Sequence, residues 1–304
     1  MRLWAQCDHA AIEGTEVFAG EDAAMLRKSV LAVLLVGTLA LGSGGAASAH
    51  DPLPPEGLPA DAILPDVIEE VPHHLQIQNT QQQEWLRFST THINVGEGNL
   101  QIRGGGQVQP CETDEIEYDQ CTVATQEILN GSGEVVYEHP AGVAVFHPEH
   151  NHWHQSAVAE FDVRTDSADP STAVARGVKI TFCFVDVEFI GTTGGQKKAK
   201  PRTYFDCNGE LQGLASWWAD SYHQSTPLQE LDITGLAEGT YYLTHTADPE
   251  DHWIESDEDN NFTWVEFFLD RHGDDGVPNG NASVTVTGNS GCVPEIICGF
   301  GGNP

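Results

Sequence analysis

The chain has 304 residues, of which 39% are apolar, and this is enough for one large domain or two small ones with a packed core. With 46 acidic residues against 13 basic ones, its formal net charge is −33, a balance that repels nucleic acid and argues against it as a partner. Because such a surface also keeps a protein soluble at high salt, we interpret it as a sign of a halophilic source.

The first 49 residues predict export rather than a folded domain. Two basic residues, Arg27 and Lys28, precede an apolar run, and small residues follow up to Ala49. This order is typical of a secretory signal peptide, so we expect translation to start at Met25 and cleavage to follow Ala49. The apolar run is shorter than a membrane span, and we therefore expect a secreted, extracellular protein without a membrane-spanning segment.

Composition divides the rest of the chain into three segments. Residues 50–63 are rich in proline and acid and are predicted to be a linker, and residues 270–304 are predicted to be a tail rich in glycine and asparagine. Between them, in residues 64–269, short apolar runs alternate with glycine and asparagine turns, and no run keeps a helical period over three turns. We therefore predict an all-β domain there, an antiparallel β-sandwich with long loops.

The cysteines agree with export. Cys7 lies in the part expected to be removed, which leaves an even number for disulfide bonds. The pairs that lie near each other in the sequence are Cys111 with Cys121, Cys183 with Cys207, and Cys292 with Cys298. Six cysteines still allow about 15 pairings, so the sequence leaves the connectivity open.

Four histidines crowd into the stretch "HPEHNHWHQSA", which starts at His147. Side chains alternate between the two faces of an extended strand, so His150, His152 and His154 are expected to project to one side. Three imidazoles suit copper, zinc, iron or nickel and leave positions open for water or substrate. We predict a metal site here, although the spacing does not select the metal, and we interpret the pair of histidines at 73–74 as solvent-exposed.

Lysine is scarce, and Lys179 lies in the middle of the predicted strand "GVKITFCFV". Alternation places it on the same face as Thr181 and Cys183, opposite the apolar residues. A lysine in this position either protects an edge strand from aggregation or serves as a functional amine. The sequence alone leaves both interpretations open.

Five motifs in order resemble the catalytic domain of the lysyl oxidases, and the resemblance covers roughly residues 64–269. The motifs are "LRFSTTHINVGEGNLQIRG", "HNHWHQSAVAEFDV", "VARGVKITFCF", "WADSYHQSTPLQELDITGLAEGTYYL" and "IESDEDNNF". The resemblance implies copper(II) and a lysine tyrosylquinone, a redox cofactor made from a lysine and a tyrosine of the chain. The implied copper ligands are His150, His152 and His154, with His147 matching a further histidine of the motif, and the implied cofactor residues are Lys179 and Tyr222.

A second metal site is predicted at the acidic loop "IESDEDNN", residues 254–261. Calcium prefers carboxylate, amide and carbonyl oxygens in a flexible arrangement, but acidic loops are common in so acidic a chain. The resemblance favours calcium, since family members bind it with a matching set of oxygen ligands. These correspond to Asp66, Val67 through its carbonyl, Glu255, Asp257, Asn260 and Asn261.

The resemblance thus implies a secreted copper- and quinone-dependent amine oxidase. Its substrates would be primary amines, either small molecules or lysine side chains of proteins, together with dioxygen, and Asp220 and Glu160 are candidates for the catalytic base. The alternative is a non-catalytic, exported β-sandwich that binds copper or zinc. A zinc hydrolase is a weaker third hypothesis, because no acid–base motif accompanies the histidines.

Overall fold

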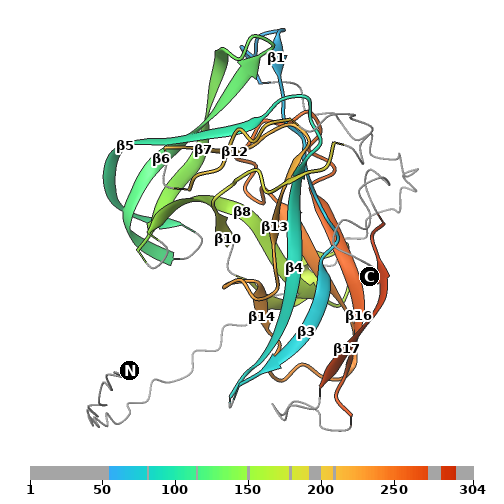
Figure 1. Cartoon of the computed structure of the whole chain (residues 1–304). Helices are drawn as coiled ribbons and strands as arrows, with labels where there is room; N and C mark the ends of the chain where they lie inside the picture. The colour runs from blue at the N-terminus through green and yellow to red at the C-terminus, as the bar shows by residue number, and fades with distance from the viewer. Residues whose placement is uncertain are drawn as a thin grey trace, which may run out of the picture. The chain divides into compact units, whose positions relative to one another are not determined.

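The computed structural model describes residues 55–80, 82–113, 116–148, 151–177, 180–191, 200–207, 210–272 and 282–291 (Figure 1). Within these ranges the regular structure is strand, apart from the 3-10 turn η1, Pro170–Thr172. None of the described segments forms a long apolar helix of the kind that spans a membrane. The prediction of an all-β fold is confirmed.

The larger of two sheets runs in the order β12-β5-β6-β7-β8-β15-β16-β17, with β1 added to β6 and with β9 and β10 added to β8. All of its pairings are antiparallel. Its strands are β1 Ala62–Ile63, β5 Leu100–Thr113, β6 Ile116–Asn130, β7 Val135–His147, β8 His152–Arg164, β9 Ala173–Arg176, β10 Ile180–Phe182, β12 Leu211–Leu214, β15 Gly239–Ala247, β16 Phe262–Asp270 and β17 Ser283–Asn289.

The smaller sheet is built around β4, which pairs with four other strands. Its order is β11-β13-β4-β14, with β2 and β3 also on β4, and all of these pairings are antiparallel. Its strands are β2 Val67–Glu69, β3 His73–Asn79, β4 Glu84–Asn94, β11 Glu188–Phe189, β13 Trp218–Tyr222 and β14 Glu230–Asp232.

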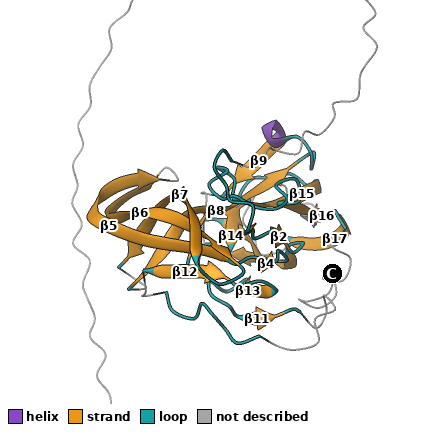
Figure 2. Ribbon diagram, turned by 90° about the horizontal axis from the view of Figure 1, so that it is seen from above, coloured by secondary structure: helices purple, strands orange, loops and turns teal. Residues whose placement is uncertain are grey.

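The core lies where β4 of the smaller sheet faces β8 of the larger one, and Figure 2 shows β4 and β14 beside β8. Phe88 of β4 and Phe161 of β8 are fully buried, and their rings meet edge to face with centroids 4.9 Å apart. Because β4 carries neighbours along both edges and the larger sheet on one face, almost all of its residues are buried. The two sheets therefore pack as a sandwich around aromatic side chains.

Parts of the segments predicted as linker and tail also join the fold. The strand β1, at the end of the predicted linker, pairs with β6, and β17, within the predicted tail, pairs with β16. Arg271 is buried beside β16, where its guanidinium binds the buried carboxylate of Glu84 and donates to the Leu236 carbonyl at 2.9 Å. Residues 1–49, predicted to hold an upstream extension and a signal peptide that starts at Met25, lie outside the described residues, so the signal peptide stays a prediction.

Two of the three disulfides expected from proximity are present. Cys111 is bonded to Cys121 across β5 and β6, and Cys183 is bonded to Cys207. Cys292 and Cys298 lie outside the described residues. The first bond joins two neighbouring strands, and the second joins the residue that follows β10 to a segment 24 residues further along the chain.

Removing the ring of Phe88 should destabilise the protein because both sheets lose a core contact. Phe88→Ala is expected to lower the free energy of unfolding by about 3–5 kcal/mol, measured by chemical denaturation. Phe205 is 70% exposed, so Phe205→Ala should stay within about 0.5 kcal/mol of the parent protein. Equal losses in both variants would contradict this view of the core.

Candidate metal and cofactor site

The histidine cluster lies at the end of the hairpin formed by β7 and β8. His147, the last residue of β7, pairs with His152, the first residue of β8. Between them Asn151 has a φ of 55°, and its N–H donates to the His147 carbonyl at 2.8 Å. The strand β8 begins at His152, so His152 and His154 lie two residues apart on one strand, as predicted. His150 lies outside the described residues.

Three imidazoles converge from the two strands of this hairpin. Nε2 of His152 lies 2.8 Å from Nε2 of His154, and the rings of His147 and His154 have centroids 4.2 Å apart. His154 is buried, whereas the other two are partly exposed. Clustered imidazole nitrogens can bind copper, zinc, iron or nickel. Of the predicted ligands, His152, His154 and the additional His147 form this cluster.

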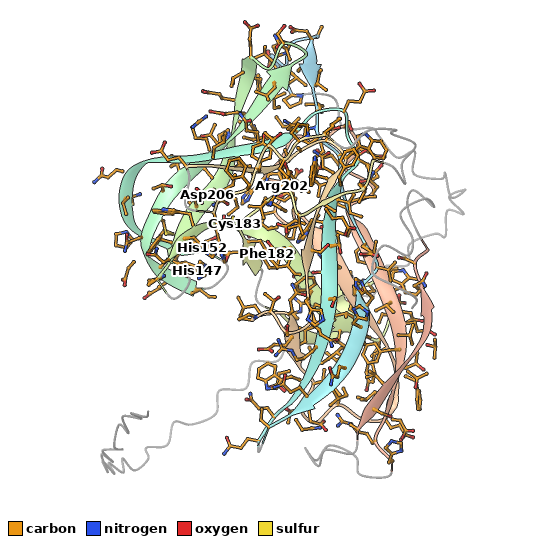
Figure 3. The ribbon with its side chains drawn as sticks, in the orientation of Figure 1. His147, His152, Phe182, Cys183, Arg202 and Asp206 are labelled. Carbon is orange, nitrogen blue, oxygen red and sulfur yellow. A yellow bond between two sulfur atoms is a disulfide. The ribbon has the colours of Figure 1, made fainter. Side chains whose placement is uncertain are left out.

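The hydroxyl of Thr181 in β10 connects the cluster to the next strand. Its Oγ1 lies 3.0 Å from Nε2 of His147 and 3.1 Å from Nδ1 of His154. Metal-binding histidines commonly use their second nitrogen for such a hydrogen bond, which orients the ring. Figure 3 shows His147 and His152 beside Phe182 and Cys183, the two residues that follow Thr181.

Tyr222, at the end of β13, contacts the same short stretch of chain. Its hydroxyl donates to the Cys183 carbonyl at 2.9 Å and to Oδ2 of Asp220 at 3.0 Å. Its ring lies against Phe182, with centroids 4.2 Å apart. The structure thus brings the predicted tyrosine and the histidine cluster to consecutive residues of one segment, 181–183, whereas Lys179 lies outside the described residues.

Burial favours the neutral forms of Tyr222 and of its neighbour Asp220. It raises the pKa of the Tyr222 phenol well above its ordinary value, and the Asp220 carboxyl adds to the effect. Burial also raises the pKa of Asp220 to about 7, even though the Val185 N–H and the charge of His92 favour the carboxylate. Of the two candidate bases, Asp220 is therefore placed at the tyrosine hydroxyl, while Glu160 lies on β8, opposite Thr246 of β15.

A cavity of about 230 Å³ opens beside Tyr222, and no motif of the sequence predicts it. Its lining includes Glu70 and Glu188 as well as His73 and His74. The interpretation of the last two as a purely exposed pair is wrong for His73, because it is partly buried and burial lowers its pKa. Burial and the charge of Glu70 raise the pKa of Glu188, so two carboxyl groups share this cavity.

The predicted calcium ligands also come together. Nδ2 of Asn260 donates to Oδ1 of Asp66 at 3.0 Å, and Nδ2 of Asn261 donates to Oε1 of Glu255 at 3.0 Å. The other carboxylate oxygen of Glu255 accepts from the Val67 N–H, which turns Val67 toward this loop. Since the N–H and C=O of one strand residue point to the same side, the Val67 carbonyl faces the loop as well.

Orphaned oxygens mark this cluster as incomplete. Oδ1 of Asn260 and Oδ1 of Asn261 are buried without a hydrogen-bond partner in the described part of the chain. Burial, together with nearby carboxylates, raises the pKa of Glu255 well above its usual range. A hard cation would satisfy both the oxygens and the charge, so this donor set fits calcium, although Asp257 is exposed.

The glycines of the "NVGEGN" turn allow this arrangement. A Cβ on Gly96 would lie 2.5 Å from the Asp66 nitrogen, and one on Gly98 would lie 2.1 Å from the Ile63 carbonyl oxygen. Only residues without a side chain let the turn approach the segment that carries Asp66 so closely.

The fold and the site define a class of protein: an antiparallel β-sandwich in which a histidine cluster and a buried tyrosine contact one short segment, residues 181–183. The family profile described as lysyl oxidase matches residues 113–274, which is more than half of the chain. The chain belongs to the lysyl oxidase family.

Individual relatives match a shorter part. Protein-lysine 6-oxidase of Sus scrofa is 31% identical over 129 residues, covering 42% of this chain and 47% of that protein. The enzyme of the same name from Bos taurus is 31% identical over 129 residues, covering 28% of its length. Lysyl oxidase homolog 3 of Homo sapiens is 31% identical over 119 residues, covering 14% of its length. The chain therefore spans less than half the length of these relatives.

Calcium should stabilise the protein through Glu255. Adding calcium at about 100 times its dissociation constant is expected to raise the melting temperature by roughly 5–10 °C, and Glu255→Gln should remove this shift. Asp259 is exposed and lies outside the predicted ligand set, so Asp259→Asn should keep it. Differential scanning calorimetry measures both, and a calcium shift that survives Glu255→Gln would exclude this ligand set.

Proposed function

We propose that the chain is a secreted copper- and quinone-dependent amine oxidase. The reaction converts a primary amine, dioxygen and water into an aldehyde, ammonia and hydrogen peroxide. Substrates are small primary amines or lysine side chains of proteins, as the names of the protein-lysine 6-oxidase relatives suggest. Bound copper and a tyrosine-derived quinone would supply the electron transfer that none of the ordinary side chains can provide.

One observation carries the proposal: the stretch 181–183 contacts the histidine cluster through Thr181 and the tyrosine through Cys183. In this proposal His150, His152 and His154 hold copper, with His147 beside them, and Lys179 and Tyr222 form the cofactor. Lys179 lies two residues before Thr181, so their Cα atoms are separated by at most about 7 Å. That spacing is compatible with an amine that reaches the tyrosine.

The chain's own residues have distinct tasks. Asp220 holds the Tyr222 hydroxyl through its Oδ2 and, when ionised, can take the phenol proton. Glu70 and Glu188 line the cavity at the tyrosine, where negative charge would attract a protonated amine. Phe182 packs against the tyrosine ring and keeps water from that face. Calcium at Asp66 and Glu255 would hold the loop before β16 to the start of β2.

A non-catalytic, exported copper- or zinc-binding sandwich is the alternative. It would use the same histidines and would need neither Lys179 nor Tyr222. The position of Asp220 against the tyrosine hydroxyl favours the oxidase, because a metal carrier has no use for a proton acceptor there.

The oxidase and the alternative differ in one covalent bond. Mass spectrometry of copper-loaded protein should detect a cross-link between the peptides that carry residues 179 and 222, and purified protein should release hydrogen peroxide from primary amines. Tyr222→Phe and Lys179→Ala should abolish both while copper binding persists. Lys200, whose amine lies 3.4 Å from Ser216 Oγ, provides the matched control, since Lys200→Ala should keep both. A metal-loaded protein without the cross-link would favour the non-catalytic alternative.

Formation of the cross-link should depend on the ionisation of Asp220. The pKa of this group is raised to about 7, so the carboxylate that accepts the phenol proton is scarce below pH 7 and dominant above it. The rate of cross-linking after copper is added should therefore rise about tenfold from pH 6 to pH 8. Asp220→Asn should slow it about 100-fold and flatten this pH profile. Glu160→Gln should leave both unchanged, and the reverse pattern would assign the proton transfer to Glu160.

A further inference from the structure

Three polar residues meet in the core between the two sheets, away from the hairpin histidines. Glu69 comes from β2, His92 from β4 and His245 from β15, and the side chains of all three are fully buried. One ligand atom of each lies within 4.8 Å of the others. No motif of the sequence joins them, because they are brought together by three strands of two sheets.

Their hydrogen bonds leave several atoms unpartnered. Oε1 of Glu69 pairs with Nδ1 of His92 at 2.6 Å. Oε2 of Glu69 lies 3.1 Å from Nε2 of His245, yet the two atoms lack hydrogen-bond geometry, and Nε2 of His92 also has no partner in the described part of the chain. Buried polar atoms normally have hydrogen-bond partners, so several unpartnered atoms at one point indicate room for a bound ion.

Aromatic rings make up much of the surroundings of the three side chains. Phe182 and Phe184 lie against His92, each with its ring centroid 5.4 Å from the imidazole centroid. Phe161 lies against His245 at 4.7 Å. A dry shell of this kind strengthens the attraction between a cation and its ligands and stiffens the position of each ring.

Protonation at this site is suited to metal binding. Burial, and then the neighbouring His92, lower the pKa of His245 well below its ordinary value, so its imidazole is neutral at pH 7. Neutral imidazole is the form that binds metal. Burial raises the pKa of Glu69 to about 7, so a bound cation would also stabilise its carboxylate, which here lacks a lysine or arginine partner among the described residues.

We propose that Glu69, His92 and His245 form a metal site distinct from the hairpin and calcium sites, which binds a zinc-class divalent transition-metal ion and links the two sheets. Two imidazoles and one carboxylate match the donors that zinc takes, whereas calcium and magnesium prefer oxygen alone. The site is next to the proposed cofactor residue Tyr222, since the rings of His92 and Tyr222 have centroids 6.0 Å apart. Its positive charge would reduce the cost of a negative charge on Tyr222 or Asp220.

The test uses the full chain and needs no oxidase activity. Replacing all four hairpin histidines, at positions 147, 150, 152 and 154, with alanine removes the copper site proposed above. After incubation with zinc and removal of excess metal, this parent variant should retain about one zinc ion per chain by elemental analysis. Zinc at about 100 times its dissociation constant should raise its melting temperature by roughly 5–10 °C.

Adding Glu69→Gln with His245→Gln to this parent should remove both the retained zinc and the thermal shift. Asp270 and His272 form an exposed pair with 3.3 Å between Oδ1 and Nδ1, so Asp270→Asn with His272→Gln is the matched control and should keep both. Glu69→Gln alone changes the shape of the side chain little and should weaken zinc binding at least tenfold even if the double change impairs folding.

Cobalt(II) serves as a spectroscopic probe of the same ligands. The parent variant loaded with cobalt should show visible absorption bands that Glu69→Gln shifts or removes. A parent variant that binds no stoichiometric zinc would overturn the proposal and leave a metal-free hydrogen-bonded network. Zinc that persists after Glu69→Gln with His245→Gln would overturn it as well, because the ion would then lie elsewhere.

Discussion

The hydroxyl of Thr181 lies within hydrogen-bonding distance of two imidazoles, and the arrangement of the site depends on this contact. It holds β10 to the hairpin of the larger sheet, while the next two residues of the same segment meet Tyr222 of the smaller sheet. Pairing of β10 with β8 and the disulfide from Cys183 to Cys207 keep this segment in place. A short segment thereby connects the histidine-rich hairpin to a tyrosine that lies many residues away in the sequence.

A shortage of positive side chains shapes the rest of the molecule. Only 13 lysines and arginines accompany 46 acidic residues, and two of the buried carboxylates, Glu84 and Asp162, already have Arg271 and Arg164 as partners. The buried Glu69 and Glu255 have no such partner among the described residues. An unpaired buried carboxylate is costly, so protonation or bound cations must offset this cost. Metal ions are therefore a natural substitute for basic side chains in this chain.

Tyr222 lies between a buried polar contact and an open cavity. Its hydroxyl points to Asp220 and the Cys183 carbonyl, and it also lines the cavity that contains Glu70 and Glu188. On the buried side, Asp220 can exchange a proton with the tyrosine hydroxyl. On the cavity side, the two glutamates offer negative charge to an approaching cation. This division of charge is what the proposed oxidation of a protonated amine would use.

The sequence by itself determined the all-β class and the placement of His152 and His154 on one strand, whereas for the disulfides it showed only which cysteines lie near each other. The first two features are local, since the period of a strand places residues two apart on one face. The resemblance between ordered motifs also predicted Tyr222 as a cofactor residue and the oxygen ligands around Glu255. The structure brings Asp66 to Asn260 and Glu255 to Asn261 within this ligand set.

Only the tertiary structure decided the remainder. His147 joins the cluster because the hairpin pairs the end of β7 with the start of β8. The contact of Tyr222 with Cys183, the cavity with Glu70 and Glu188, and the buried trio of Glu69, His92 and His245 all depend on how the two sheets pack. Packing between sheets brings together residues far apart in the chain, and no local period or spacing records which strands will face each other.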